Sequence, residues 1–198
     1  MDSLLLNERV IKWCFKGITE ATLATTSNRQ ELQKAKSIED LWGNSVMKTT
    51  GSGQWSTKLC ENLVEEALVA LGRVNVHRAV PKKSTLREKK YSPDLECDNY
   101  VYEVKGRSWT TSGTAGEKVL GVPLKYGEVP RLYNKPLQII LVGYQEYEVK
   151  KSFAFGNLLD SHDQTQELRD SIAFYKSHNI EYIGFTDILK KLGLRENY

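Results

Sequence analysis

The sequence is poor in cysteine and has no long hydrophobic run. The N-terminal apolar segment, residues 4–6, is followed at once by Asn7 and Glu8, so it is too short for a signal peptide or a membrane helix. Cys14, Cys60 and Cys97 are too few and too scattered for a disulfide framework or a Cys-x-x-Cys metal site. These absences favour a cytoplasmic globular protein.

Metal-binding histidine spacing and nucleotide-binding loops are also absent. His77, His162 and His178 lie far apart in the sequence, which argues against a zinc site. The glycine-rich segments around Gly51 and Gly113 do not have P-loop spacing. We therefore expect neither zinc chemistry nor nucleotide hydrolysis.

The composition is that of an ordinary globular chain, but its positive charge is concentrated. The 198 residues suffice for one domain with a sizeable core, and the net charge is only +3. Between Arg73 and Lys90, however, seven cations face the single anion Glu88. Such a patch attracts polyanions, although a solvated lysine-rich loop has the same pattern.

Apolar spacing predicts several helices. Leu4, Ile11 and Ile18 indicate a first helix, and a second is expected from Ser37 or before, where Ser37 and Asp40 resemble a capping box. Residues 44–54 are expected to form a loop. The most regular apolar stripe covers residues 56–71, and further helices are predicted at 117–126, 165–177 and 186–192.

Alternating or buried apolar runs predict the strands. They cover residues 74–80, 91–96, 100–105, 137–144 and 180–185. The expected fold is one α/β domain over residues 1–198, with a mixed central sheet flanked by helices. Residues 1–50 form an extra N-terminal helical part, 56–144 the catalytic core, and 145–198 complete the sheet and its helices.

The hairpin around Asp98 and Asn99 is predicted to place two carboxylates together. A two-residue loop pairs Leu95 with Tyr102 and sets Asp94 opposite Glu103, on the face that also carries Lys105. Two carboxylates with Cβ atoms about 5 Å apart repel each other and need a compensating charge. A bridging Mg²⁺ supplies that charge, whereas an exposed ion pair on a surface hairpin is the alternative.

These residues carry a family resemblance. Pro93-Asp94, then eight residues, then Glu103-Val104-Lys105 resembles the motif of the PD-(D/E)xK nucleases, which include restriction endonucleases. The resemblance implies a restriction-endonuclease-like core in which Asp94, Glu103 and the Val104 carbonyl hold Mg²⁺. Asp94, Glu103 and Lys105 would be catalytic.

The family often adds an acidic residue from the helix before the hairpin, and three glutamates of residues 56–71 compete for that role. Glu61 lies about 90° from the centre of the apolar stripe, whereas Glu65 and Glu66 lie about 130° from it. Glu61 is therefore the candidate catalytic residue. A solvated helix glutamate is the alternative interpretation.

Contacts to DNA are expected from the basic patch and from the loop after the second hairpin strand. The hydroxyls, backbone N–H groups and cations there suit phosphate contacts, although an ordinary turn-rich connection fits too. The candidates are Lys82, Lys83, Arg107, Thr110, Thr111, Ser112, Thr114 and Lys118.

A free-standing domain of this length most resembles a Type II restriction endonuclease. That implies a homodimer that cuts double-stranded DNA to leave 5′-phosphate and 3′-hydroxyl ends, with a cognate DNA methyltransferase as functional partner. Two alternatives remain open: a structure-specific or repair nuclease such as a junction resolvase, and an inactive DNA-binding protein on the same fold.

Overall fold

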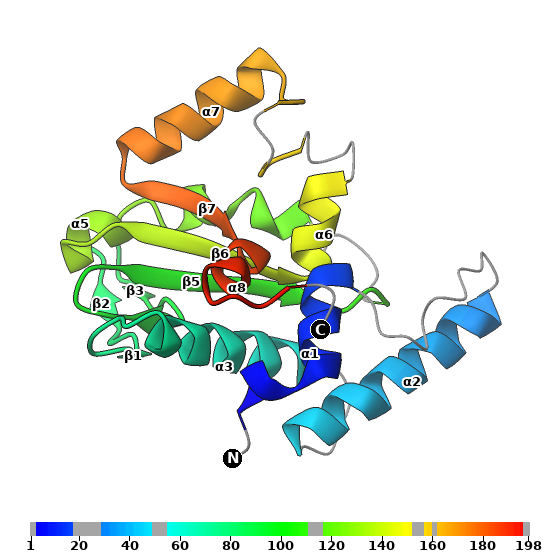
Figure 1. Ribbon diagram of the computed structural model, residues 1–198. Helices are drawn as coiled ribbons and strands as arrows, with labels where there is room; N and C mark the ends of the chain where they lie inside the picture. Colours follow the sequence, from blue (N-terminus) through cyan, green and yellow to red (C-terminus); the bar gives the residue numbers. More distant parts are fainter. Residues whose placement is uncertain are drawn as a thin grey trace.

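A five-stranded mixed sheet forms the centre of the molecule (Figure 1). The computed structural model describes residues 3–17, 29–48, 55–110, 117–151, 157–159 and 162–195. The strand order is β1-β4-β5-β6-β7, antiparallel from β1 to β5 and parallel from β5 to β7. The strands are β1 (His77–Arg78), β4 (Leu95–Glu96), β5 (Val101–Arg107), β6 (Leu137–Gly143) and β7 (Ile180–Gly184).

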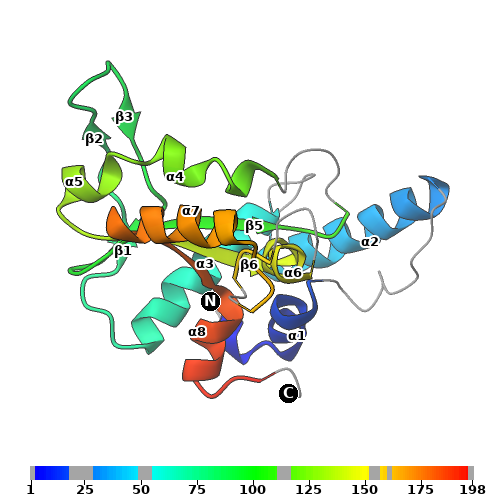
Figure 2. The same ribbon diagram turned by 90° about the horizontal axis from the view of Figure 1, so that it is seen from above.

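Helices cover both faces of this sheet (Figures 1 and 2). One face packs against η1 (Leu4–Leu6), α1 (Glu8–Lys16), α3 (Trp55–Ala70) and α8 (Phe185–Lys191). The other packs against η3 (Glu117–Val119), α4 (Val122–Lys125), α5 (Val129–Tyr133) and α7 (Gln166–Ser177). Helix α6 (Tyr144–Lys151) follows β6, and α2 (Arg29–Met47) lies against α3.

Side-chain alternation along β5 produces two hydrophobic cores, one on each face of the sheet. Val101 joins the core under α4, α5 and α7, whereas Tyr102 and Val104 join the core under α1, α3 and α8. Glu103 and Lys105 therefore belong to the face of Val101, as predicted. The β6 strand is buried along its whole length, which agrees with the prediction of a central strand.

Three tryptophans join the N-terminal helices to the core. The rings of Trp13, Trp42 and Trp55 lie 5.6 to 6.0 Å apart, and Trp13 and Trp55 are fully buried. The indole of Trp55 also donates a 2.8 Å hydrogen bond to Asp40. Trp13 and Trp55 are therefore core residues.

The N-terminal helices agree with the predictions only in part. Helix α1 ends at Lys16, where Gly17 takes a left-handed φ of 71°, and the predicted position Ile18 lies outside the described residues. Helix α2 spans Arg29–Met47, which agrees with a helix from Ser37 or before. The capping-box interpretation was wrong, because Ser37 is internal and its hydroxyl donates to the carbonyl of Gln33. The helix also continues to Met47, through the start of the predicted loop.

Several predicted strands are shorter than expected. The strand predicted over residues 91–96 divides at Pro93, which has no N–H for a ladder. Its first part, β3 (Lys90–Tyr91), pairs with β2 (Lys82–Lys83) in a separate ribbon. Neither Asp98 nor Asn99 in the hairpin loop has a positive φ, although two-residue hairpin loops commonly do. Helices α5 and α6 and the β2–β3 ribbon were not predicted.

Candidate active site

The predicted pairing of β4 with β5 is correct. The candidate site lies beside this pairing, at Asp94 before β4 and at Glu103 on β5. Leu95 pairs with Tyr102 and Glu96 with Val101. The backbone N–H of Asp94 donates to Tyr102 (3.0 Å), while its Oδ2 accepts a 2.7 Å hydrogen bond from the N–H of Val104. The Asp94 carboxylate thus accepts from the backbone of β5 just beyond the paired residues of β4 and β5.

Glu103 is a buried carboxylate with one cationic partner. It is 2% exposed, and its Oε1 accepts a 2.5 Å hydrogen bond from Nζ of Lys105. Its Oε2 is buried and has no hydrogen-bond partner. The Lys105 ammonium also donates to the Val104 carbonyl (3.1 Å), so it contacts two of the three predicted metal ligands.

The environment of Asp94 raises its pKa to about 6 from the ordinary value of 3.8. Burial is the main cause, and the charge of Glu103 is the second; Lys105 and the Val104 N–H oppose them. The charge of Glu61 raises this pKa further. Asp94 and Glu103 are therefore electrostatic neighbours, as the register argument predicted.

Among the three competing glutamates of α3, Glu61 is the one whose charge acts on Asp94. It also accepts a 2.5 Å hydrogen bond from Arg78 of β1. Glu65 lies 3.7 Å from Arg78, and Glu66 accepts from the backbone N–H of Leu4. The helical angle thus selected the glutamate whose charge acts on Asp94, although its partner Arg78 was not foreseen.

Gly106 allows α3 to lie close to β5. A Cβ atom at this position would stand 2.1 Å from Sγ and 2.9 Å from Cβ of Cys60. Because real Cβ atoms do not approach other atoms so closely, only glycine permits this helix position. Helix α3, which carries Glu61, thereby packs closely against β5.

Tyr126, directly after α4, lies near the two carboxylates. It is buried, and burial followed by the adjacent charge of Glu103 raises the pKa of its phenol well above the ordinary range. Its ring lies 6.0 Å from that of Tyr91. No motif marked Tyr126, because its proximity to Glu103 arises only when α4 folds over β5.

A cleft of about 660 Å³ opens beside Lys105. It lies between the N-terminal turn of α3, the end of β5 and the η3–α4 segment. Four cationic residues contribute to its walls, which suits a polyanionic ligand. The lining residues are Ser56, Thr57, Lys105, Gly106, Arg107, Lys118, Gly121, Val122, Lys125 and Gln145.

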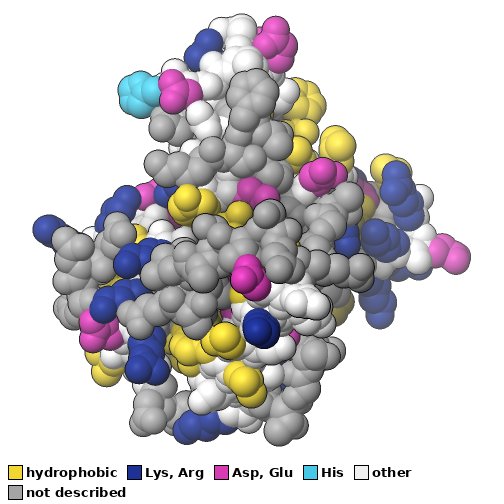
Figure 3. Space-filling view, turned by 90° about the vertical axis from the view of Figure 1, so that its right-hand side faces the viewer, with side chains coloured by type: hydrophobic (Ala, Val, Ile, Leu, Met, Phe, Trp, Pro, Cys, Tyr) yellow, Lys and Arg dark blue, Asp and Glu magenta, His cyan; other side chains and the backbone are white. Residues whose placement is uncertain are grey.

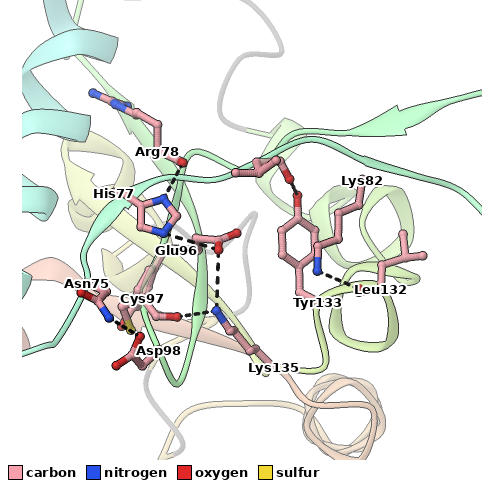
Figure 4. Close-up of polar contacts among 12 residues, drawn as sticks. Asn75, His77, Arg78, Lys82, Glu96, Cys97, Asp98, Leu132, Tyr133 and Lys135 are labelled. Atoms are coloured by element: carbon pink, nitrogen blue, oxygen red, sulfur yellow. Dashed lines mark hydrogen bonds and ion pairs between the residues drawn. The ribbon is translucent and has the colours of Figure 1, made fainter.

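The predicted DNA contacts occupy different environments. Lys83 and Lys118 are exposed. Arg107 pairs with Glu148 and lies over the ring of Tyr144, and the hydroxyl of Thr110 donates to Glu39 (2.5 Å). The Lys82 ammonium donates to the Leu132 carbonyl and lies over the ring of Tyr133 (Figure 4). Thr111, Ser112 and Thr114 lie outside the described residues.

The donors at this edge fit a hard cation only in part. In the described part of the chain, no group of three or more His, Cys, Asp or Glu side chains is arranged to hold a metal. Asp94, Glu103 and the Val104 carbonyl nevertheless supply oxygen atoms, and the buried Oε2 of Glu103 makes no hydrogen bond within the distance criterion, although the Tyr126 phenol interacts with the same carboxylate. These three residues are the ones that would hold Mg²⁺.

No protein-family model matches this chain, and comparisons with curated proteins and with solved structures find no match either. Among the described helices, none has the length and apolar character needed to cross a membrane. The fold is thus α/β, with a mixed five-stranded sheet between helices. Its distinctive feature is the group of Asp94, which directly precedes β4, with Glu103 and Lys105 of the neighbouring strand β5.

Proposed function

We propose that this protein is a Mg²⁺-dependent endonuclease of the PD-(D/E)xK type that cuts double-stranded DNA. The observation that carries the proposal is the hydrogen bond from the Val104 N–H to Asp94, which holds this carboxylate beside the Glu103-Val104-Lys105 segment. A surface hairpin with an exposed ion pair would not bury Glu103 to 2% exposure. The burial favours a built site over that alternative.

Asp94, Glu103 and the Val104 carbonyl would hold the ion. Bound Mg²⁺ would polarise the phosphate and make water a better nucleophile. The Lys105 ammonium would donate to the phosphate oxygen on which negative charge develops. Glu61 would accept a hydrogen bond from water at the same edge, while Arg78 holds the glutamate in place.

The cationic cleft beside Lys105 is suited to the sugar–phosphate backbone that flanks the cleaved bond. Lys118 and Lys125 are exposed on its rim, and their charges would replace condensed counterions of the DNA. Such contacts position the duplex without reading its sequence. Sequence-specific cleavage rests on the resemblance to Type II restriction endonucleases.

The same resemblance supports a homodimer, because cutting both strands of a palindromic site needs two active sites. Each would leave 5′-phosphate and 3′-hydroxyl ends. A cognate methyltransferase would protect host DNA without forming a stable complex.

Incubation of the purified protein with plasmid DNA and Mg²⁺ tests this proposal. A sequence-specific endonuclease gives discrete fragments whose ends map to one short site. Cleavage confined to branched or damaged DNA would instead indicate a resolvase or repair nuclease. Binding without cleavage would indicate a DNA-binding protein and would overturn the enzymatic proposal.

A further inference from the structure

The β2–β3 ribbon and its connecting turn, residues 82–91, form a projection that we call the basic arm. Lys82 pairs with Tyr91 and Lys83 with Lys90 in an antiparallel ribbon separate from the main sheet. Figure 2 shows the arm extending beyond the helices and the sheet. The basic arm is thus a distinct surface element. The basic patch between Arg73 and Lys90 is larger, because it also includes Arg73 and Arg78, which precede the arm.

The outer part of the arm combines positive charge with one large apolar side chain. Lys83, Arg87 and Lys90 are exposed, and Glu88 is the only acidic residue in the arm. Figure 3 shows Lys and Arg side chains gathered on the projection at the right of that view, the side on which the arm lies. Leu86 at the turn is 80% exposed.

The turn of the arm is held in one conformation by Glu128, just before α5. The Glu128 carboxylate accepts hydrogen bonds from Ser84 (2.5 Å) and Thr85 (2.8 Å), which lower its pKa to about 2. The Ser84 hydroxyl also accepts from the backbone N–H groups of Leu86 and Arg87, each at 3.1 Å. Leu86 is therefore presented by an ordered turn.

The base of the arm is fixed as well (Figure 4). The Tyr133 hydroxyl donates to the carbonyl of Val80 (2.6 Å), and the Lys82 ammonium donates to the Leu132 carbonyl (3.1 Å). An arm ordered at both ends loses less conformational entropy when it binds a ligand. This order distinguishes it from a merely solvated loop.

We propose that the basic arm binds duplex DNA, with its cations on the phosphates and Leu86 inserted into the minor groove against a base step. Cationic elements that present an apolar side chain bind the minor groove in this way, because partial unstacking of one step lets more protein surface contact the bent duplex. The choice of DNA as ligand rests on the proposed nuclease function.

The arm leads directly into the candidate active site. Its last residue, Tyr91, packs against Tyr126, and Leu86 precedes Asp94 by eight residues. An extended chain of that length spans at most about 26 Å. Leu86 would therefore contact DNA within about seven base pairs of the cleaved bond.

Equilibrium binding without divalent metal tests the electrostatic part. The full chain is titrated against a fluorescent 30-base-pair duplex at several salt concentrations. Replacing Lys83, Arg87 and Lys90 by Gln should weaken binding at least tenfold and reduce the log–log salt slope by about 2 to 3. The control replaces the exposed Lys16, Lys34 and Lys191 by Gln, which changes the net charge equally and should leave the slope nearly unchanged.

Leu86→Ala tests the wedge, with Leu41→Ala as control because Leu41 is also exposed, at 71%, but lies on α2. Fluorescence of 2-aminopurine in the duplex should rise severalfold with the wild type and with Leu41→Ala, but much less with Leu86→Ala. Equal signals from all three, or equal effects of the two triple variants, would overturn the proposal. Binding of single-stranded DNA alone would also overturn it.

These outcomes separate the arm from the nuclease. A wild-type protein that binds duplex DNA through the arm without cleaving it supports the arm and contradicts the nuclease. Cleavage that is unaffected by the arm substitutions, with unchanged affinity, contradicts the arm alone.

Discussion

Oδ2 of Asp94 accepts a 2.7 Å hydrogen bond from the backbone N–H of Val104, the residue between Glu103 and Lys105. Asp94 directly precedes β4 (Leu95–Glu96), so at this position a side chain, and not a backbone carbonyl, bonds to β5. This hydrogen bond fixes the position of Asp94 relative to β5 without a further strand residue. The separation of the carboxylates thus depends on the strand pairing.

The raised pKa of Asp94 makes stability depend on pH in a defined direction. Because the folded-state pKa is about 6 and the ordinary value is 3.8, the folded protein binds the proton more tightly than the unfolded chain. The contribution of Asp94 to stability is therefore complete below about pH 4 and is lost as the pH rises through 6. Ionisation of Asp94 should destabilise the metal-free protein at pH 8.

Asp94→Asn removes this ionisation but keeps an acceptor for the Val104 N–H. Urea unfolding in EDTA should find the variant about 1 to 2 kcal/mol more stable than the wild type at pH 8 and equally stable at pH 4. Addition of Mg²⁺ should stabilise only the wild type. A stability difference that is the same at both pH values would contradict the assigned pKa.

If the proposed nuclease mechanism holds, Lys105→Ala should lower the cleavage rate about 10²- to 10³-fold, because the ammonium would stabilise charge in the transition state. It should not weaken Mg²⁺ binding, since Lys105 donates to Glu103 Oε1 and to the Val104 carbonyl and would compete with the ion for them. Single-turnover kinetics and Mg²⁺-dependent thermal shifts measure the two effects. The exposed Lys34→Ala is the control, and loss of metal binding in Lys105→Ala would show that the lysine holds the site together instead.

Gly106→Ala should destabilise the fold by about 1 to 3 kcal/mol, because its Cβ would overlap Sγ of Cys60. The double variant Gly106→Ala, Cys60→Ala lacks that Sγ and should recover part of the lost stability. The free energies of unfolding of the two single variants should therefore be non-additive by at least about 0.5 kcal/mol. Gly121→Ala is the control, since an added Cβ there would lie 3.7 Å from the carbonyl oxygen of Lys118, which is an ordinary van der Waals contact. Strictly additive effects would show that α3 can move away from β5 freely.

Glu39 of α2 holds the chain that leaves β5. Its fully buried carboxylate accepts from the backbone N–H groups of Trp109 (3.3 Å) and Thr110 (3.2 Å) and from the Thr110 hydroxyl. Glu39→Ala leaves these donors unpaired and should destabilise the protein by about 2 to 4 kcal/mol in urea unfolding. The exposed Glu31→Ala on the same helix should change stability by less than about 0.5 kcal/mol.

The local features of the site were predictable from the sequence. Strand alternation placed Glu103 and Lys105 on one face, and the short hairpin gave the correct pairing of Leu95 with Tyr102. The helical angle selected Glu61 because α3 is regular and long. These inferences depend on neighbours in the sequence, for which backbone geometry is sufficient.

Features that depend on distant partners were not predictable. Thr110 was a candidate DNA contact, yet its partner Glu39 lies 71 residues away in the sequence. Arg107 similarly pairs with Glu148, and Tyr126 reaches Glu103 only through the packing of α4. The β2–β3 ribbon was missed because its strands are short and charged, so no apolar alternation marks them.

Mg²⁺-dependent cleavage of plasmid DNA by the wild type and by Glu103→Gln is the most direct test of the proposed nuclease. The exposed Glu117→Gln serves as the matched control. The wild type and Glu117→Gln should cut to discrete fragments, whereas Glu103→Gln should bind the same DNA without cutting it. Full cleavage by Glu103→Gln, or none by the wild type with Mg²⁺, would contradict the assignment of this site.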